Sequence, residues 1–471
     1  MTADGGGAPA SAGVDGVLSP REDTEPPAQV RIWAAVAVGL ALVGVAATIW
    51  RPVAPRLPSE LPPQASFDAA LLATIDRYRT PRVWLAPVVT ALAVLVPAAI
   101  ASSSGAARLA TFLTGDRTRA AWRGGVVAAC IAAVTWLVAL PIVAWVGLVH
   151  EGRWGFRTST SLGWFRDQVL VAGGRWLAVG IGVVALLAAR DRWPRSWPYR
   201  LTLAATVAAL VLVVVHPIVL QPLLLRTEPL PAGPARDAIE DILAGAGHAA
   251  TPVLVADASR RTTRVNAMVT GLGPTERVIV YDTLLELPAA QVAAVVAHEL
   301  AHREHADVLR GTALTAVAAL VGLLALRAVV DAPASRRRTR ARSAGDPRLV
   351  PLIVAVAAVL ELVGTPVGAA VSRRVEAAAD HRALELGTDP AELVRTVRTF
   401  VVRDLAIPEP ERPIQLLYGT HPSPSQRLRA AAAAAEARGT SLPSIEDLQR
   451  EERTLRHPLA PIPDTGTGGD R

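Results

Sequence analysis

Lysine is absent from the 471-residue chain, so all 48 of its basic residues are arginines, and 41 acidic residues leave a net charge of +7. Aromatic residues make up only 4% of the chain. A nucleic-acid-binding surface needs basic residues gathered on one folded face with aromatics between them. Here the arginines stand mainly between apolar runs, so the sequence argues against nucleic acid as a partner.

Cysteine is nearly absent as well. Cys130 is the single cysteine and lies inside an apolar run, which excludes an intrachain disulfide and a thiolate metal site. The first thirty residues are polar and rich in Gly, Ala and Pro, and they lack the apolar stretch of a cleavable signal peptide. We therefore expect the first apolar run to be an uncleaved membrane span.

Long apolar runs dominate the rest of the chain, which is 51% hydrophobic with a mean hydropathy of +0.34. Seven runs reach the roughly 20 residues that cross a bilayer. They lie near 32–50, 83–103, 123–147, 168–189, 201–225, 311–330 and 349–371. Tryptophan or arginine stands at several ends of these runs, as interfacial anchors do. Any single run could instead be a buried soluble helix, because periodicity does not separate the two.

These runs predict an all-α polytopic membrane protein with seven transmembrane helices. We expect a disordered tail at 1–30, a five-helix transmembrane region at 31–225, a catalytic insert at 226–310, two further transmembrane helices at 311–371, a C-terminal catalytic segment at 372–454 and a disordered tail at 455–471. In the insert, 253–256 and 277–281 are β-branched segments typical of strands. A helical pattern follows. The insert is therefore predicted to be mainly helical with a short β-hairpin.

The string VVAHELAHREHAD carries the clearest chemistry in the insert. His298 and His302 are four residues apart, so they project from one helix face with about 6 Å of rise between them. That spacing lets both imidazoles reach one zinc ion. Glu299 stands beside them, where a carboxylate can take a proton from the activated water. An amphipathic surface helix could carry the same residues, so the prediction of a zinc site needs a third ligand.

The string SRRVEAAAD supplies that ligand. Glu376 and Asp380 are four residues apart on a helical pattern, so one carboxylate can bind the metal while the other accepts the outer N–H of a ligating histidine. Two predicted crossings separate His302 from Glu376, and an even number returns the chain to the same membrane face. The sequence thus predicts one zinc ion per chain, held by His298, His302 and Glu376, with Asp380 behind a histidine.

Other ionisable residues are weaker candidates. His305 shares the face of His298 but lies about 10 Å further along the helix axis, so we do not expect it to be a ligand. Glu361 and Arg175 fall inside predicted spans, where ionisable groups face a bundle interior or an aqueous cavity. They could line a chamber or pair with neighbours, and the sequence leaves both alternatives open.

Four more motifs, with HELAH, resemble the integral-membrane CAAX prenyl protease family of zinc metallopeptidases over about 140–430. They are LPIVAWVGLVHEGRWGFRTSTSLGWFRDQ, HPIVLQPLL, DASRRTTRVNAMVTGLGPTERVIVYDTLL and HPSPSQR. The zinc helix departs from the family pattern at Ala301 and Arg303, where the family usually has glycine and tryptophan. This difference concerns the choice of substrate more than the chemistry.

The resemblance implies seven helices around an enclosed chamber, and a substrate from whose prenylated C-terminus three residues are removed. It also implies that Asn266 binds the substrate backbone, and that His421 and Arg427 stabilise the oxyanion. Donors aimed at developing negative charge are a large term in peptide hydrolysis. From the residues alone, Asn266 could instead be a turn residue and Arg427 a solvated helix charge.

We therefore expect a zinc metalloendopeptidase in the cell membrane, surrounded by lipid, acting on a peptide or protein that is lipidated or membrane-embedded. The oligomeric state is not predicted. The resemblance places the catalytic face in the cytoplasm, whereas the six arginines of 331–348 favour the reverse under the positive-inside rule.

Three alternatives stay open. A bacterial protease of the same chemistry would serve membrane-protein quality control if prenylated proteins are absent. A non-catalytic membrane scaffold would keep zinc for structure alone, and a transporter would carry a zinc-regulated domain. The general base beside the ligands favours an enzyme.

Overall fold

The computed structural model describes residues 60–103, 117–343 and 345–455, together with positions 34, 39 and 105. In this part of the chain six helices are long and apolar enough to cross a membrane. They are Ala69–Ser102, Ala120–Arg153, Ser161–Arg192, Trp197–Val219, Asp307–Val330 and Pro347–Glu385. They match the second to the seventh predicted span. The first, at 32–50, and the two expected tails lie almost entirely outside the described residues.

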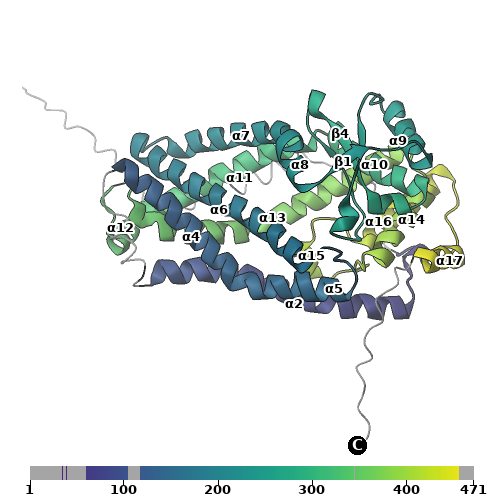
Figure 1. Cartoon of the computed structure of the whole chain (residues 1–471), viewed down its shortest axis with the longest axis horizontal. Coiled ribbons are helices and arrows are strands. Elements are labelled where there is room, and N and C mark those ends of the chain that lie inside the picture. Colours follow the sequence, from purple (N-terminus) through teal and green to yellow (C-terminus); the bar gives the residue numbers. More distant parts are fainter. Residues whose placement is uncertain are drawn as a thin grey trace, which may run out of the picture.

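The six spans run along the length of the molecule (Figure 1). Their main helices are α2 (Ala69–Ser102), α4 (Arg117–Ala144), α6 (Ser161–Arg192), α7 (Trp197–Val215), α11 (Asp307–Val330) and α13 (Val350–Glu385). α4 continues through a π-helical segment (Trp145–His150) into α5 (Glu151–Arg153), and α7 through another (His216–Leu220) into α8 (Gln221–Leu224). At 1.5 Å per residue, the 36 residues of α13 extend about 54 Å. Because a hydrocarbon core is only about 30 Å thick, α13 can carry catalytic residues beyond it.

Close helix contacts hold the bundle together. α4 and α6 cross where Gly125 meets Gly180, and a Cβ added at Gly125 would lie 2.8 Å from the Gly180 carbonyl oxygen. Small residues allow this approach of helix backbones inside a membrane. Beyond the crossing, Val127, Leu187 and Ile353 pack in a common core. Many large apolar side chains point outward, as expected for surfaces in contact with lipid, including Leu95 at 62% exposure.

A four-stranded sheet lies in the large insert, in the order β1-β2-β4-β3. Its strands are β1 (Thr227–Pro229), β2 (Val253–Ala256), β3 (Ala267–Thr270) and β4 (Arg277–Tyr281). The two segments predicted as strands are β2 and β4, but they pair in parallel, so they are not the arms of a hairpin. The antiparallel hairpin is β3–β4. β3 was not predicted, although two of its four residues (AMVT) are β-branched, the same share as in β2 (VLVA).

Two helices pack on this sheet, α9 (Pro234–Gly245) and α10 (Ala289–Glu304). Ile239 of α9 and Val292 and Val296 of α10 share a core with Val278 and Val280 of β4. Residues two apart on a strand point to the same face, so β4 presents both valines to the helices. This packing fixes one face of α10 and leaves another for chemistry.

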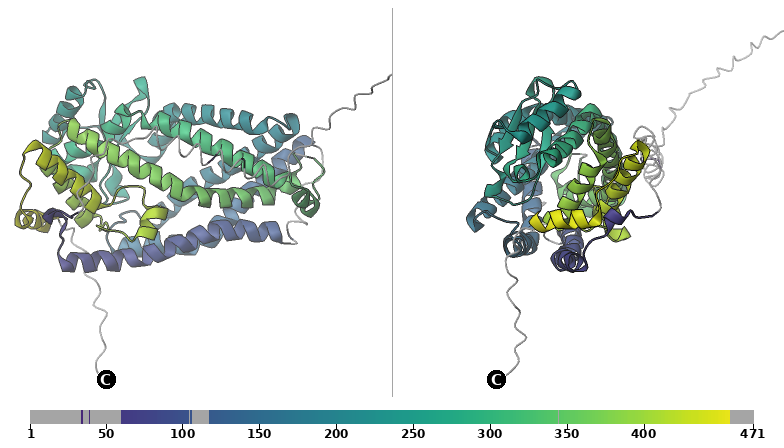
Figure 2. Two further views of the ribbon diagram at one scale, coloured as in Figure 1. Left: turned by 180° about the vertical axis from the view of Figure 1, so that it is seen from behind. Right: turned by 90° about the vertical axis from the view of Figure 1, so that its right-hand side faces the viewer.

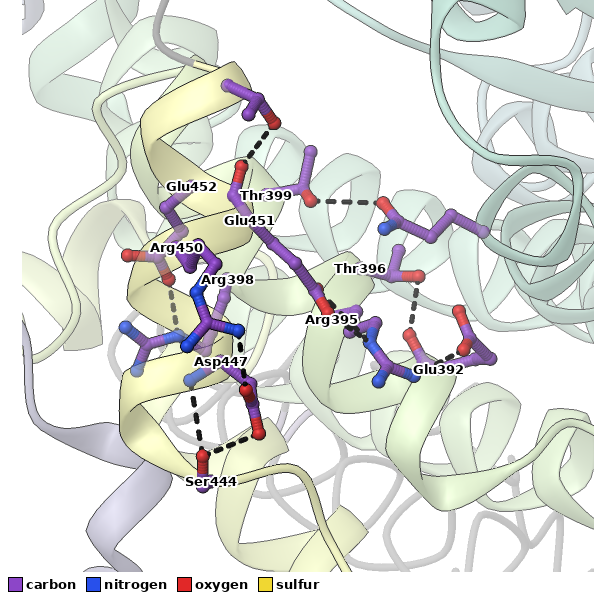
Figure 3. A network of polar contacts seen from close by, with 12 residues as sticks. Glu392, Arg395, Thr396, Arg398, Thr399, Ser444, Asp447, Arg450, Glu451 and Glu452 are labelled. Carbon is purple, nitrogen blue, oxygen red and sulfur yellow. Dashed lines mark hydrogen bonds and ion pairs between the residues drawn. The ribbon is translucent and has the colours of Figure 1, made fainter.

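The C-terminal helices are α14 (Pro390–Arg403), α15 (Arg412–Tyr418), α16 (Pro424–Arg438) and α17 (Ile445–Leu455). Of these, α14, α16 and α17 lie at the opposite end of the molecule from α12 (Pro333–Thr339) (Figures 1 and 2). Figure 3 shows how α14 is fixed. Arg398, 1% exposed, binds Glu452 of α17 and the carbonyl of Gln64. The hydroxyl of Thr399 donates to the amide oxygen of Gln291 on α10, at 3.0 Å. α14 thus connects α10, which carries the HELAH motif, to α17 and to the segment around Gln64.

Candidate metal centre

Three nitrogen and oxygen atoms from α10 and α13 converge on one point. His298 Nε2 lies 3.1 Å from Glu376 Oε2, and the Nε2 atoms of His298 and His302 are 3.3 Å apart. The third edge, His302 Nε2 to Glu376 Oε2, is 3.7 Å. Ligand atoms of a tetrahedral zinc with bonds of 2.0–2.1 Å stand about 3.3 Å apart. The triangle therefore has the size of three corners of one tetrahedral metal site, and the fourth corner remains for water or substrate.

A carboxylate stands behind each histidine. His298 Nδ1 lies 2.9 Å from Asp380 Oδ1, and His302 Nδ1 lies 2.9 Å from Asp307 Oδ2. A carboxylate there accepts the outer N–H, so the proton stays on Nδ1 and the lone pair of Nε2 faces the metal position. The two carboxylates thus favour the tautomer, and hold the ring orientation, that ligation requires.

Sequence reasoning gave Asp307 no such role. It lies five residues after His302, beyond a helix end that no glycine marks. Ala306 has φ 52°, in the left-handed region, between α10 and α11. This turn brings the first residue of α11 back toward the His302 ring. The sequence showed only that an acidic residue follows HExxH closely, and this alone does not predict the turn that brings Asp307 to His302.

Arg427 of α16 lies behind Asp380. Its Nε donates to Oδ2 at 2.8 Å and its Nη2 to Oδ1 at 2.6 Å, a bidentate pair. Burial opposes its charge, but the Asp380 carboxylate raises the pKa of Arg427. The side chain is 14% exposed, so it is not a solvated helix charge. The chain of contacts runs from Arg427 through Asp380 to His298.

Glu299 lies beside the two histidines on α10. Ligand-type atoms of Glu299, His298 and His302 all lie within 4.8 Å of one another. Burial raises the pKa of the Glu299 carboxyl. A carboxylate here can accept a proton from a molecule at the fourth corner, and desolvation strengthens it as a base.

His421 reaches the same centre from the segment between α15 and α16. Its Nε2 lies 3.3 Å from Glu376 Oε2, and its side chain is 61% exposed. The backbone around it is fixed, because Gln415 Nε2 donates to the His421 carbonyl at 2.8 Å and Arg373 Nη1 donates to the Gly419 carbonyl at 2.6 Å. His421 thus lies on the solvent side of the triangle.

Asn266 lies at the start of the edge strand β3. Its carbonyl accepts the N–H of Tyr281 at 3.0 Å, and its side chain is exposed. Since β3 is at the end of the strand order, its outer edge can pair with an extended peptide.

The remaining sequence candidates lie away from the triangle. Arg175 Nη2 and Glu361 Oε1 are 3.5 Å apart across α6 and α13, with both side chains 72% exposed. They form the pair that the sequence left as one of two alternatives. His305 is the C-cap residue of α10 and belongs to none of the contacts that define the triangle.

Two family models match the chain. The model of peptidase family M48 matches residues 229–435, and the model described as CAAX prenyl protease N-terminal, five membrane helices, matches residues 54–226. Their boundary falls between α8 and β1, where the transmembrane helices give way to the sheet. Together the two models cover the six spans of the described residues and the candidate metal centre.

Individual relatives agree. An uncharacterized metalloprotease, YhfN of Bacillus subtilis (strain 168), is 26% identical over 63% of this chain and 70% of its own length. The CAAX prenyl protease 1 homolog of Arabidopsis thaliana is 29% identical over 36% of this chain and 41% of its own. A protease HtpX homolog of Acidiphilium cryptum (strain JF-5) is 35% identical over 28% of this chain and 45% of its own. The matches to these last two thus span less than half of each relative.

A solved structure shares the fold. The crystal structure of S. mikatae Ste24p superposes with a TM-score of 0.62 at 17% identity, covering 87% of this chain and 99% of that chain. The family models and the relatives indicate a metallopeptidase. The chain is a multi-pass membrane metallopeptidase that resembles peptidase family M48 and the CAAX prenyl proteases.

Proposed function

We propose that this chain is a zinc endopeptidase that cleaves peptides presented at the membrane, with His298, His302 and Glu376 as the ligands. The observation that carries the proposal is the triangle of ligand atoms, with edges of 3.1, 3.3 and 3.7 Å. Two nitrogens and one carboxylate oxygen are the donor set of many catalytic zinc sites. A zinc ion bound there would polarise the carbonyl of the peptide bond to be cleaved and would lower the pKa of a bound water to about 7.

The protein's own groups do the rest. Glu299 takes the proton of the attacking water and passes it to the leaving amine nitrogen. His421 faces the open side of the centre, where it donates to the oxyanion. Arg427 holds Asp380, which holds the His298 ring, so we assign Arg427 a positioning role in place of the oxyanion role that the resemblance implies. Asn266 and the edge of β3 align the extended substrate.

The proposed substrate is a peptide or protein that carries a lipid near its C-terminus or lies in the membrane. This proposal draws on the relatives named as CAAX prenyl proteases. Clearance of unfolded membrane proteins is the alternative with the same chemistry, and the test below includes it.

The test compares the wild type with Glu299→Gln on a farnesylated CAAX peptide, the same peptide without the lipid, and an unfolded membrane protein. We expect cleavage by the wild type, a loss of roughly 10²–10⁴-fold in Glu299→Gln because general acid–base catalysis is removed, and equal zinc in both. Equal cleavage by the two forms would refute the mechanism. Zinc binding without any cleavage would favour the scaffold or the transporter.

For orientation we propose the cell membrane with the catalytic end toward the cytoplasm, as the resemblance implies. The arginine-rich segment 331–348 then faces outward, against the positive-inside rule. A reporter enzyme inserted within 334–345 tests this directly. We expect the reporter to be active outside the cytoplasm. Reporter activity on the cytoplasmic side would show that the proposed orientation is wrong.

A further inference from the structure

The segment that leads into the edge strand β3 is joined to the membrane bundle as well as to the sheet. Residues 156–158, in the connection between α5 and α6, pair with residues 261–263 in the antiparallel sense. One of the hydrogen bonds in this pairing runs from Thr263 N to the Phe156 carbonyl, at 3.2 Å. The chain therefore enters β3 from a position that depends on the membrane helices.

Arg264 extends this connection into the bundle. Its Nη2 donates to Glu151 Oε2 at 3.0 Å and also to the Tyr78 hydroxyl. Glu151 belongs to α5 and Tyr78 to α2, so a single side chain of the insert contacts two elements of the bundle. The Tyr78 hydroxyl donates to Glu151 Oε1 at 2.7 Å, and Arg82 of α2 pairs with the same carboxylate. Because Tyr78 is fully buried and Glu151 is only 15% exposed, these charge-assisted hydrogen bonds are well shielded from water.

The backbone of Arg264 is held from the opposite side. The buried Thr283 donates its hydroxyl to the Arg264 carbonyl at 2.8 Å. Thr283 lies in the turn Asp282–Glu286, which connects β4 to α10. The guanidinium carbon of Arg264 also lies 4.2 Å from the centre of the Phe156 ring, a cation–π contact. Arg264 thus joins the membrane bundle to the segment that leads into the helix of the HELAH motif.

The strand that follows Arg264 is short. Asn266 is two residues further on, and β3 itself has four residues and pairs with β4 on one side alone. Its position therefore depends on the contacts at its start as well as on the sheet. A peptide that pairs with the free edge of β3 takes its register from that strand, and a slip of one residue exchanges the faces of all its side chains. Such a slip would also bring a different peptide bond to the metal centre.

We propose that Arg264 is a positioning residue, which through Glu151 and Tyr78 fixes the free edge of β3 and so determines which peptide bond of the substrate is cleaved. The proposal rests on the endopeptidase function and on the role of Asn266 proposed above. A misplacement of about 1 Å caused by a distant substitution can lower a rate by roughly 100-fold. A small displacement of the β3 edge is therefore enough to change both the rate and the site of cleavage.

The test measures kcat/KM and identifies the cleaved bonds by mass spectrometry, for the farnesylated CAAX peptide and the unfolded membrane protein of the test above. In Arg264→Gln we expect kcat/KM to fall by about tenfold and cleavage to spread to neighbouring bonds, with an unchanged zinc content. Glu151→Gln should also spread the cleavage. The double variant should be no worse than the more damaging single variant, because the two side chains act through one contact.

Arg260→Gln is the matched control. Arg260 lies in the same segment, is 59% exposed and pairs with Asp257 three residues earlier, so its loss should leave the rate and the cleaved bond as in the wild type. Arg264→Lys should recover part of the activity that Arg264→Gln loses. The reason is that Nη2 alone makes both contacts of the guanidinium with Glu151 and Tyr78, and one ammonium group can donate to both.

Two results would overturn the role of Arg264 and leave the endopeptidase function intact. One is a wild-type kcat/KM with unchanged cleavage sites in Arg264→Gln. The other is a loss of activity that comes with loss of zinc and is not recovered by Arg264→Lys, since that would show a purely structural contribution. A wild type that cleaves neither substrate would refute the endopeptidase function and this proposal together.

Discussion

At the scale of single residues, the candidate site is organised by what stands behind the ligands. Asp307 and Asp380 each lie 2.9 Å from the outer nitrogen of a histidine, and Arg427 clamps Asp380. The spacing of residues in the sequence was enough to predict the two histidines of HExxH and the distant glutamate as ligands. It did not predict Asp307 as the partner of His302, because that contact depends on the backbone turn at Ala306.

Asp307→Asn should weaken zinc affinity by roughly 10–100-fold, the usual effect of losing an outer partner of a ligating histidine. The amide can still accept a hydrogen bond but no longer supplies the negative charge that makes the imidazole more basic. A zinc competition titration of the purified protein measures the change. Asp237→Asn, exposed on α9, is the control, and equal affinities in the two variants would contradict this role of Asp307.

The losses of kcat/KM caused by Arg427→Ala and by Asp380→Asn should not be additive. If Arg427 acts through Asp380, the double variant should be no worse in kcat/KM than the more damaging single variant, since contacting residues couple strongly. A direct oxyanion contact by Arg427 predicts instead that the two losses multiply. Arg427→Lys should rescue little, because an ammonium cannot reproduce the bidentate geometry.

At the scale of elements, the length of the apolar runs predicted the transmembrane helices. The β-branched segments predicted strands but could not predict how the strands pair. All six predicted spans that fall in the described residues are helices. β2 and β4 were recognised as strands, but their parallel pairing depends on the long connection that also forms β3. Such pairing is decided by contacts distant in sequence, which propensity does not contain.

The junction of α10 and α11 offers a test at this scale. Ala306 has a φ of 52°, a conformation that costs a residue with a Cβ roughly 1 kcal/mol and costs glycine little. Ala306→Gly should therefore raise the midpoint of thermal unfolding in detergent. Ala433→Gly, inside α16, should lower it by the usual helix penalty. A lower midpoint for Ala306→Gly would show that the turn is not strained.

At the scale of the whole molecule, the metal centre depends on segments that are far apart in the sequence. Transmembrane helix α13 brings Glu376 and Asp380, the insert brings α10, and the C-terminal segment brings His421 and Arg427. The network of Figure 3 then joins α14 to α10 and to α17. Arg398 also donates to the carbonyl of Gln64, which adds the segment before α2. The sequence indicated these regions separately, and only their packing unites them.

Glu452→Gln should destabilise this assembly by about 3 kcal/mol, because it leaves the buried Arg398 guanidinium without its counter-charge. Its neighbour Glu451 pairs with Arg395 but is 44% exposed. Glu451→Gln should therefore cost less than about 1 kcal/mol. Unfolding of the two variants side by side in detergent gives the comparison, and equal losses would mean that the Arg398 pair is not critical.

The zinc content of three purified forms, measured by mass spectrometry, tests the metal centre most directly. We expect one zinc per chain in the wild type and in Glu299→Gln, and a large loss in Glu376→Gln, because only the latter removes a corner of the triangle. If Glu376→Gln kept its zinc with wild-type affinity, α13 would not supply a ligand, and the assignment of this centre would be wrong.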